Sequence, residues 1–432
     1  MIIVDTALEK REAARRPVRV GLIGAGYIAR GIARQLLTPL PGIRLVAIAN
    51  RTPAKARNIY REFGADSVGD VSSAIRLEAM IDADRPVVTE DAALLCNAGN
   101  IDIVVETTGQ VEFGARTAMA AIDGGKHTLL VNAELDATIG PILKRKADAA
   151  GVVITNTDGD EPGVAMNLVR FVKTIGYRPV MAGNIKGFID PYRNPDTQRA
   201  FAERVKQSAD MITSFADGTK LSMECTILGN ATGFVPARPG MHGHPCKHVR
   251  DVIQHFSAEE LLETPLVEYA LGAEPGTGAF VVGYNDEPVK KQYMQYFKMG
   301  DGPLYVFYTP FHLTHLECAV TIGRAVLFGD AAVAPRGGPV CDVAAVAKRD
   351  LREGEVLDGI GGFCCFGRIY DAASSQDQRL LPMGLMRDCR LVRDIPKDTP
   401  LTYYDVQCPV DRLCDQLRAE QDAVFFPQAV AV

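Results

Sequence analysis

The sequence lacks the features by which several classes of protein are recognised. No apolar run among its 432 residues approaches the roughly 20 residues that a membrane-spanning helix needs. Ten cysteines are scattered without a CxxC pair, and the adjacent Cys364 and Cys365 are typical of neither a zinc site nor a disulfide framework. The formal net charge of -6 argues against a protein that binds nucleic acid or an anionic membrane.

The N-terminus also lacks the apolar core of a signal peptide, because "MIIVDTALEKREAARR" becomes charged after a few residues. We therefore expect a reduced, cytoplasmic, enzyme-like protein. Its 47% hydrophobic and 23% charged residues are ordinary for a well-packed globular chain, so a folded core is expected throughout. A chain of 432 residues exceeds what one core usually supports, and we expect two or three domains.

Short apolar strands alternate with helical patterns in the first part of the chain. This alternation predicts an α/β fold, with a doubly wound parallel Rossmann sheet that is covered by helices on both faces. We place this domain at residues 1–160. The predicted strands are "VRVGLIG" (18–24), "IRLVAIANR" (43–51), "IDIVVETTG" (101–109), "HTLLVNAE" (127–134) and "VVITNTD" (152–158).

From Gly183 onward the pattern changes to that of an α+β domain, which we place at residues 161–337 and expect to bind substrate and to dimerise. A Gly/Pro-rich segment, "GDAAVAPRGGPV", predicts a boundary near residue 338. Helical stretches near 196–216 and 258–271 separate the strand-like phrases. These phrases are "GNIKGFID", "GAFVVGYN", "GPLYVFYT" and "GRAVLFGD".

The phrase "GLIGAGYIARG" places Gly24, Gly26 and Ala29 between a predicted strand and a predicted helix. The first glycine permits a tight turn, and the second lets a pyrophosphate approach the backbone. The free N–H groups at the helix start then face the phosphates. This context predicts a dinucleotide site, to which Tyr27 and Ile28 also contribute.

The end of the second strand indicates which dinucleotide is bound. An NAD site normally has an acidic residue there, whereas this chain offers Asn50 and Arg51. A guanidinium suits a 2′-phosphate, so NADPH is favoured over NADH; otherwise Arg51 is only a solvated residue at a helix start. Thr107 and Gly109, at the end of the "IDIVVETTG" strand, are further candidates for cofactor binding.

Two phrases near the C-terminus, "AKRDLREGEVL" (347–357) and "LVRDIPKDTPLTYYDV" (391–406), are loosely alike. They resemble the repeats of the SAF domain, a small all-β fold of the β-clip type, which implies such a domain at residues 338–432. Asp398 stands where that family usually has glycine, a departure at a turn.

The stretch "DIVVETTGQVEFGARTAMAAIDGGKHTLLVNAE" resembles the homoserine dehydrogenase superfamily. Members of that superfamily carry a catalytic lysine where this chain has Glu134. The substitution reverses the charge at the expected reaction centre and argues against ordinary homoserine oxidation through a lysine acid/base. A homodimer is usual for the superfamily and is expected here.

The order of the three domains resembles the DXR-like (DRL-type) 1-deoxy-D-xylulose 5-phosphate reductoisomerases. The resemblance implies rearrangement of an α-hydroxyketone, assisted by Mn²⁺ or Mg²⁺, followed by reduction with NADPH. Hard cations prefer carboxylate oxygens. We therefore predict a metal site from four acidic residues at strand ends, with Glu134 and Asp158 also catalytic: Glu134, Asp158, Asp160 and Glu161.

Part of the acidic phrase "TDGDEPG" has a structural explanation. A helix is predicted after Pro162, and Asp160 or Glu161 then lies at its cap, while Asp158 turns the chain. A helix cap requires one carboxylate, and a turn requires a second. The three acids of this phrase, together with Glu134, are more than these two structural roles require. A purely structural role for all of them is the alternative.

Basic and imidazole groups in the second domain are candidates for substrate binding. Lys186 is a catalytic and substrate-binding candidate, or else pairs with a neighbouring acid. In "GMHGHPCKH", His242 and His244 are candidates for a loop that closes over a substrate phosphate. A metal site or a plain surface turn are the alternatives there. His312 and His315 are interpreted as core or interface histidines.

Two further readings of the function stay open. One is an NADP-dependent dehydrogenase that oxidises a homoserine-like or polyhydroxy-acid substrate without a metal. The other is a sugar-binding protein with a degenerate Rossmann unit, against which the intact glycines argue.

Overall fold

The structure, a computed structural model, describes residues 3–65 and 67–427. The described chain forms two compact units. Unit 1 comprises the residues up to Gly159 together with Leu313–Ala334, and unit 2 comprises Asp160–His312 together with the residues from Pro335 onward. Within the described ranges, no helix combines the length and the apolar character that crossing a membrane requires.

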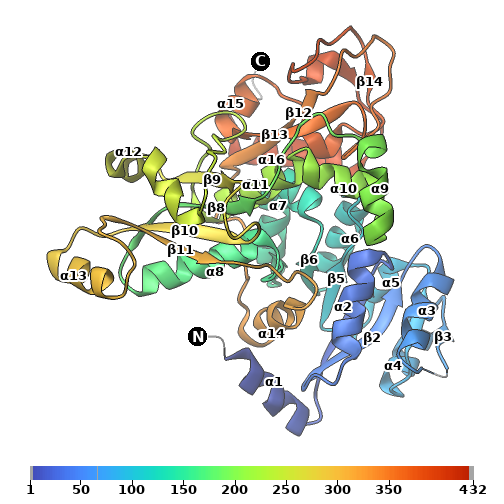
Figure 1. The fold of residues 1–432 in the computed structure, drawn as a ribbon. Helices are drawn as coiled ribbons and strands as arrows, with labels where there is room; N and C mark the ends of the chain where they lie inside the picture. Colours follow the sequence, from blue (N-terminus) through green and yellow to red (C-terminus); the bar gives the residue numbers. More distant parts are fainter. Residues whose placement is uncertain (1–2, 66, 428–432) are drawn as a thin grey trace. The chain divides into compact units, whose positions relative to one another are not determined.

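A seven-stranded parallel sheet forms the centre of unit 1 (Figure 1). The strand order is β3-β4-β2-β1-β5-β6-β7, so β1 lies in the middle and the later strands are added toward both edges. This order confirms the predicted α/β fold with a doubly wound Rossmann sheet. The strands are β1 (Val18–Ile23), β2 (Ile43–Ala49), β3 (Gly69–Asp70), β4 (Val87–Thr89), β5 (Ile103–Glu106), β6 (His127–Leu130) and β7 (Ile154–Asn156).

Helices cover both faces of this sheet. Successive strand side chains point to opposite faces, so neighbours such as Val104 and Val105 belong to two separate apolar clusters. One cluster joins the sheet to α1, α2, α3 and α14, and the other joins it to α4, α5 and α6. The helices are α1 (Val4–Ala13), α2 (Tyr27–Leu37), α3 (Pro53–Glu62), α4 (Ala74–Asp82), α5 (Ala92–Asn97), α6 (Val111–Asp123), α7 (Ala133–Ala149) and α14 (Cys318–Phe328).

The phrase "GRAVLFGD" is helical, so its prediction as a strand is wrong. It lies in α14, which ends at Phe328. Cys318, Ile322 and Ala325 recur at helical spacing and are fully buried in the core of unit 1. The short apolar run "AVLF" does not by itself distinguish a buried strand from a buried helix, and packing decides for the helix.

Unit 2 contains a four-stranded sheet of order β11-β10-β8-β9, in which only β8 and β9 are parallel. It confirms three of the strand-like phrases of the predicted α+β domain, whereas β9 occupies the end of the stretch 258–271 for which the sequence predicts a helix. The strands are β8 (Arg178–Lys186), β9 (Leu266–Leu271), β10 (Ala279–Tyr284) and β11 (Leu304–Thr309). The helices are α8 (Glu161–Thr174), α9 (Pro195–Val205), α10 (Ala209–Ala216), α11 (Thr219–Thr232), η1 (Val249–His255), α12 (Ala258–Glu263) and α13 (Pro288–Tyr296).

The C-terminal part of unit 2 contains two antiparallel strand pairs, β12–β13 and β14–β15, and adds helices to the predicted strands. The two similar phrases form a pseudo-symmetric pair within it. Asp350 accepts a hydrogen bond from the Lys397 amide, and Asp394 accepts one from the Glu353 amide. The elements are β12 (Cys341–Ala347), β13 (Cys365–Asp371), α15 (Ala372–Asp377), η2 (Met383–Leu385), β14 (Arg390–Leu391), η3 (Tyr403–Asp405), β15 (Val406–Gln407) and α16 (Leu413–Phe425).

Gly354 and Asp398 occupy corresponding turns of the two phrases, and both have positive φ, +80° and +66°. Only glycine adopts this left-handed region without steric cost, and aspartate is among the few other residues that enter it at all. The turn at Asp398 therefore requires the conformation that glycine would supply.

A buried ion pair anchors α16 to β12. The Arg418 guanidinium contacts Asp342, with Nη2 2.6 Å from Oδ2, and both side chains are almost fully buried. Burial opposes ionisation of Asp342, but Arg418 lowers the pKa of this carboxyl below its usual value. Its contribution to stability is therefore present above the unfolded-state pKa of about 3.9 and is lost as the pH falls through the folded-state pKa.

We expect Asp342→Asn to lower the free energy of unfolding by about 3 kcal/mol at neutral pH, because it leaves Arg418 buried beside an amide. Urea titration measures the change, and the difference from wild type should shrink as the pH falls below about 4. Asp394→Asn is the matched control, since the Asp394–Arg352 pair is exposed and should have little effect. An equal loss in both variants would contradict the assignment.

Candidate active site

The turn between β1 and α2 has the geometry of a dinucleotide phosphate site. Gly24 has a φ of +117°, and a Cβ at this residue would lie 2.4 Å from the Thr107 hydroxyl oxygen, so only glycine fits. Gly26 caps α2 without a side-chain hydrogen bond, and a Cβ there would meet nothing within 4 Å. Open space therefore faces the free N–H groups of the first turn, which is what a pyrophosphate requires.

The remaining predicted cofactor residues lie at the same carboxyl edge of the sheet. Asn50 follows β2 and donates a hydrogen bond from its side chain to the Thr52 carbonyl, and Arg51 is exposed beside it. Gly109 follows β5 in a left-handed conformation, with a φ of +64°. In the first turn of α2, Tyr27 is half exposed and Ile28 partly buried. Their contacts with a cofactor stay a prediction.

A buried carboxyl, Glu106, ends β5 and is absent from the site residues that the sequence predicts. It accepts hydrogen bonds from the Thr108 amide (2.7 Å) and the Asn132 side chain (2.8 Å). Burial raises the pKa of Glu106, and the nearby charge of Glu134 raises it further. Glu134 lies in the first turn of α7 and is itself buried. The structure therefore places two carboxyl groups at this sheet edge.

Asp158 is engaged in a network that joins β7 to α14. Its carboxylate forms a buried ion pair with Arg324 and accepts a hydrogen bond from the Thr321 hydroxyl (3.0 Å). Arg324 also pairs with Asp330. Asp158 and Glu134 belong to unit 1, whereas Asp160 and Glu161 belong to unit 2. A metal-binding role for Asp158 stays a prediction, but a cation would have to compete with the Arg324 guanidinium.

Helix α8 begins at Glu161, which confirms the helix predicted after Pro162. Asp160 occupies the N-cap position, yet its side chain makes no capping hydrogen bond there. Both carboxylates are buried, Asp160 with 5% and Glu161 with 3% of its surface exposed. Capping therefore does not account for this acidic pair.

Lys186, at the end of β8, lies between two buried carboxylates. Its Nζ is 2.5 Å from Oε1 of Glu161 and 3.3 Å from Oε2 of Glu224, which lies on α11. His312, after β11, places Nδ1 3.3 Å from Oε2 of Glu161. We call these residues, with Asp160, the lysine–carboxylate cluster. The Lys186 side chain retains 20% exposure, so a small molecule can reach it.

Burial and neighbouring charges shift the pKa values of the cluster's carboxyl groups in different directions. Burial opposes ionisation of Glu161, but Lys186 and His312 lower the pKa of this carboxyl to about 2. Burial raises the pKa of Glu224 well above its usual range, and Glu161 raises it further. Burial also raises the pKa of Asp160, against the attraction of Lys220. A carboxyl of lowered pKa beside one of raised pKa is the arrangement from which general acid and base pairs are made.

Asp160, Glu161 and His312 also offer ligand atoms for a cation. One such atom from each lies within 4.8 Å of the others, and no second group of this kind occurs in the part of the chain that the structure describes. Two carboxylates with one imidazole suit Mn²⁺ better than the all-oxygen preference of Mg²⁺. The donor set therefore fits a divalent cation, and it includes His312, which the sequence analysis interprets as a core or interface histidine.

Sequence reasoning also misses Glu224. The signal that could have found it is its position in "LSMECTILGNAT", where a single acid interrupts a run of apolar and small residues. All of α11 except Lys220 is buried, so Glu224 is a charged residue type inside a buried helix. Such residues are rare without a partner or a function.

His242 and His244 do come together, in a stack with a third histidine. Their ring centroids lie 5.0 Å apart, and those of His244 and His255 lie 4.2 Å apart. The fully buried Glu268 accepts hydrogen bonds from the His242 and Gly243 amides. Burial and the neighbouring histidines lower the pKa of His244, which favours its neutral form. Binding of a substrate phosphate by this loop stays a prediction.

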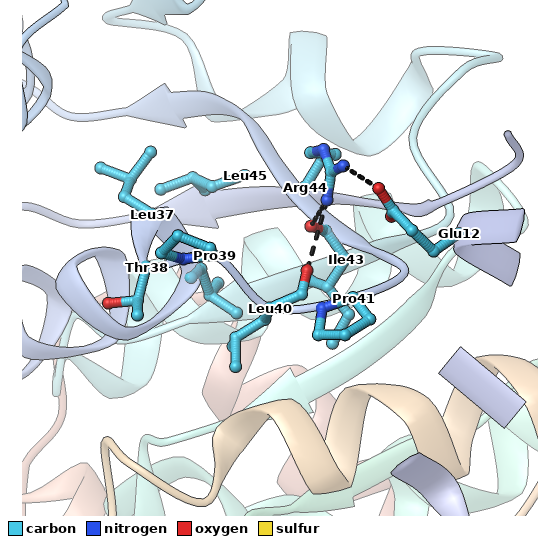
Figure 2. Close-up of a pocket in the computed structure, with 10 residues that line it drawn as sticks. Glu12, Leu37, Thr38, Pro39, Leu40, Pro41, Ile43, Arg44 and Leu45 are labelled. Carbon is cyan, nitrogen blue, oxygen red and sulfur yellow. Dashed lines mark hydrogen bonds and ion pairs between the residues drawn. The ribbon is translucent and has the colours of Figure 1, made fainter. Parts of the chain in front are cut away.

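Figure 2 shows a surface pocket of about 400 Å³ between the end of α2 and the start of β2. Arg44 and Glu12 close one side of it with an ion pair of 2.6 Å. The pocket lies at the amino end of β2, whereas Gly24 and Asn50 lie at the carboxyl ends of their strands. Dinucleotides bind at carboxyl ends in such sheets, so this pocket is separate from the cofactor site.

Two protein-family models match parts of this chain. Residues 18–130 match a family model described as an oxidoreductase family with an NAD-binding Rossmann fold, named GFO_IDH_MocA. Residues 159–318 match a second, described as the catalytic domain of oxidoreductase DRL. That second stretch contains every member of the lysine–carboxylate cluster. No match was found among curated proteins.

The comparison with solved structures also returned similar chains, three of which follow. A homoserine dehydrogenase from Thiobacillus denitrificans is 18% identical, with 78% of this chain and 83% of that chain covered and a TM-score of 0.44. A probable dehydrogenase from Thermotoga maritima is 12% identical, with coverage of 74% and 91% and a TM-score of 0.43. A scyllo-inositol dehydrogenase from Lactobacillus casei is 12% identical, with coverage of 72% and 87% and a TM-score of 0.41.

The two family matches agree with the geometry of the units that contain them. The glycine turn of unit 1 lies inside the NAD-binding match, and the cluster of unit 2 lies inside the oxidoreductase catalytic match. The two matches support an oxidoreductase whose first unit contains a nicotinamide-dinucleotide-binding Rossmann fold.

Proposed function

We propose that the protein is an NADPH-dependent reductoisomerase that converts 1-deoxy-D-xylulose 5-phosphate to 2-C-methyl-D-erythritol 4-phosphate. The observation that carries the proposal is the lysine–carboxylate cluster, which lies in the stretch matched by the catalytic domain of oxidoreductase DRL. It combines a fixed ammonium group with a carboxyl of raised pKa, and reduction of the aldehyde that the rearrangement forms uses both.

Lys186 is the residue that binds substrate oxygen in this proposal. Its ammonium group contacts Glu161 and Glu224, and the negative charge of Glu161 raises its pKa against the effect of burial. It is therefore a permanent hydrogen-bond donor for a substrate hydroxyl or phosphate. Glu161 keeps the ammonium group in place and stays ionised.

Glu224 supplies the proton. Reduction of an aldehyde adds a hydride to carbon and needs one proton at the oxygen that becomes a hydroxyl. Burial raises the pKa of Glu224 well above its usual range, which favours its neutral form, and the Asn184 side chain donates a hydrogen bond of 2.7 Å to its Oε2. A neutral carboxyl is a general acid, and it becomes a carboxylate beside Lys186 when it has given up its proton.

Asp160, Glu161 and His312 would hold the divalent cation that the rearrangement needs. When bound there, such a cation polarises the ketone and hydroxyl oxygens of the substrate. This proposed set differs from the four acidic residues that the sequence suggests, because it includes an imidazole and leaves Asp158 in its pair with Arg324.

The assay that tests the proposal combines purified protein, 1-deoxy-D-xylulose 5-phosphate, NADPH and Mn²⁺. We expect NADPH to be consumed, with a branched product identified by NMR and with loss of turnover in EDTA. We also expect kcat/KM to be at least about tenfold higher with NADPH than with NADH, since Arg51 would pair with the 2′-phosphate.

Two outcomes would overturn the proposal. Folded protein that binds NADPH but does not consume it with this substrate excludes the named reaction. Metal-independent oxidation of a homoserine-like or polyhydroxy acid, without any skeletal change, would instead identify a simple dehydrogenase.

A further inference from the structure

Two cysteines of the C-terminal region face each other across a pair of strands. β14 and β15 are antiparallel, with Arg390 opposite Gln407 and Leu391 opposite Val406. The same register, continued by one residue, places Cys389 opposite Cys408. Neither cysteine stands out in the sequence, because 18 residues separate them and they form no recognised motif.

The backbone hydrogen bonds show which kind of cross-strand position this is. The Cys389 carbonyl accepts from the Leu357 amide, and the Leu391 amide donates to Glu355, so both residues turn their backbone groups away from β15. Cys389 and Cys408 therefore occupy a non-hydrogen-bonded position. Opposite Cα atoms lie about 4.5 Å apart at such positions, which is within the span of a disulfide.

Only one of the two thiols is accessible. The neighbouring Cys389 thiol lowers the pKa of Cys408 to about 7, while burial acts in the opposite direction and Arg412 assists. The Cys389 thiol donates a hydrogen bond to the Leu385 carbonyl (3.3 Å), and Cys408 and burial raise its pKa. All ten cysteines lie in the described part of the chain, and Cys408 is the one that is not buried.

We propose that Cys408 and Cys389 form a peroxide-reactive dithiol that closes to a cross-strand disulfide. The Cys408 thiolate attacks hydrogen peroxide, the O–O bond breaks, and the departing hydroxide takes up a proton to give water and a sulfenic acid. The Cys389 thiol then attacks the Cys408 sulfur, the S–S bond forms, and the sulfenic oxygen leaves as a second water. One peroxide is reduced while two thiols are oxidised.

The test is a peptide map of the full chain after treatment with a small excess of hydrogen peroxide and blocking with N-ethylmaleimide. We expect a peptide pair linked between Cys389 and Cys408 that disappears on treatment with dithiothreitol. In untreated protein, iodoacetamide should modify Cys408 with a rate that is half-maximal near pH 7.

Variants separate the roles of the two thiols. Cys408→Ser should abolish the link. Cys389→Ser should accumulate a sulfenic acid at Cys408 that dimedone traps, and should move the alkylation midpoint up toward about 8.5, the value of an ordinary thiol. Cys414→Ser, which removes a buried thiol in the same region, is the matched control and should leave the link unchanged.

The peptide map of the wild-type protein tests the proposed disulfide even if a variant fails to fold. Recovery of both Cys389 and Cys408 as blocked thiols, with an alkylation midpoint near that of an ordinary thiol, would overturn the proposal. A link from Cys408 to another cysteine would overturn it as well. Neither result depends on the proposed catalytic function.

Discussion

Replacing Gly26 with valine is expected to raise the dissociation constant for NADPH about a hundredfold while leaving the fold intact. The valine side chain would enter the open space in front of the first turn of α2, where a Cβ meets no protein atom within 4 Å. It would keep a pyrophosphate from the free N–H groups, and losing one or two hydrogen bonds to a charged group costs about 3 kcal/mol. Isothermal calorimetry with NADPH measures the change.

Gly337→Val is the matched control for this experiment. A Cβ at Gly337 would likewise meet no protein atom within 4 Å, and this glycine has no positive φ, but it lies in unit 2. We expect its affinity for NADPH to equal that of wild type, and the melting temperatures of both variants to stay within a few degrees of the wild-type value. Wild-type affinity in Gly26→Val would contradict the assignment of the phosphate site.

The second large effect is expected for Glu224→Gln, which should lower kcat about a thousandfold. Glutamine keeps the size of a neutral carboxyl and its hydrogen bond with Asn184, but it has no proton to give. Because burial raises the pKa of Glu224 and so favours its neutral form, the substitution is expected to remove little charge. We therefore expect the free energy of unfolding in urea to change by less than about 1 kcal/mol.

The pH dependence provides an independent measurement. A general acid works in its protonated form, so wild-type kcat should be constant below the raised pKa of Glu224 and should fall as the pH rises through it. Glu224→Gln should lose this descending limb. Glu203→Gln, on the exposed side of α9, is the control and should keep both the rate and the profile. A fully active Glu224→Gln would remove Glu224 from the mechanism.

Several local features are predictable because they depend on residues that are close in sequence. Each of these features is visible within a short stretch of sequence. They are the glycines of the β1–α2 turn, the alternation of strands and helices, and the helix start at Pro162. The tertiary structure confirms them. It changes the interpretation of "GRAVLFGD", where the apolar residues are too few for their period to be recognised.

The lysine–carboxylate cluster is not predictable in the same way. Its members come from the start of α8, the end of β8, the middle of α11 and the segment after β11. Lys186 and Glu161 are candidates in the sequence, yet nothing there indicates that they touch or that Glu224 and His312 complete the group. The pKa values of these groups depend on burial, and burial cannot be recognised from a local sequence pattern.

The fold class and the dinucleotide turn follow from the amino-acid sequence alone, because backbone conformation and hydrophobic periodicity are local properties. The partners of the acidic residues depend instead on tertiary packing. Asp158 pairs with Arg324 and Glu161 with Lys186, although the two acids are only three positions apart. The physical reason is that a buried charge takes its state from the groups packed around it, and those groups come from distant parts of the chain.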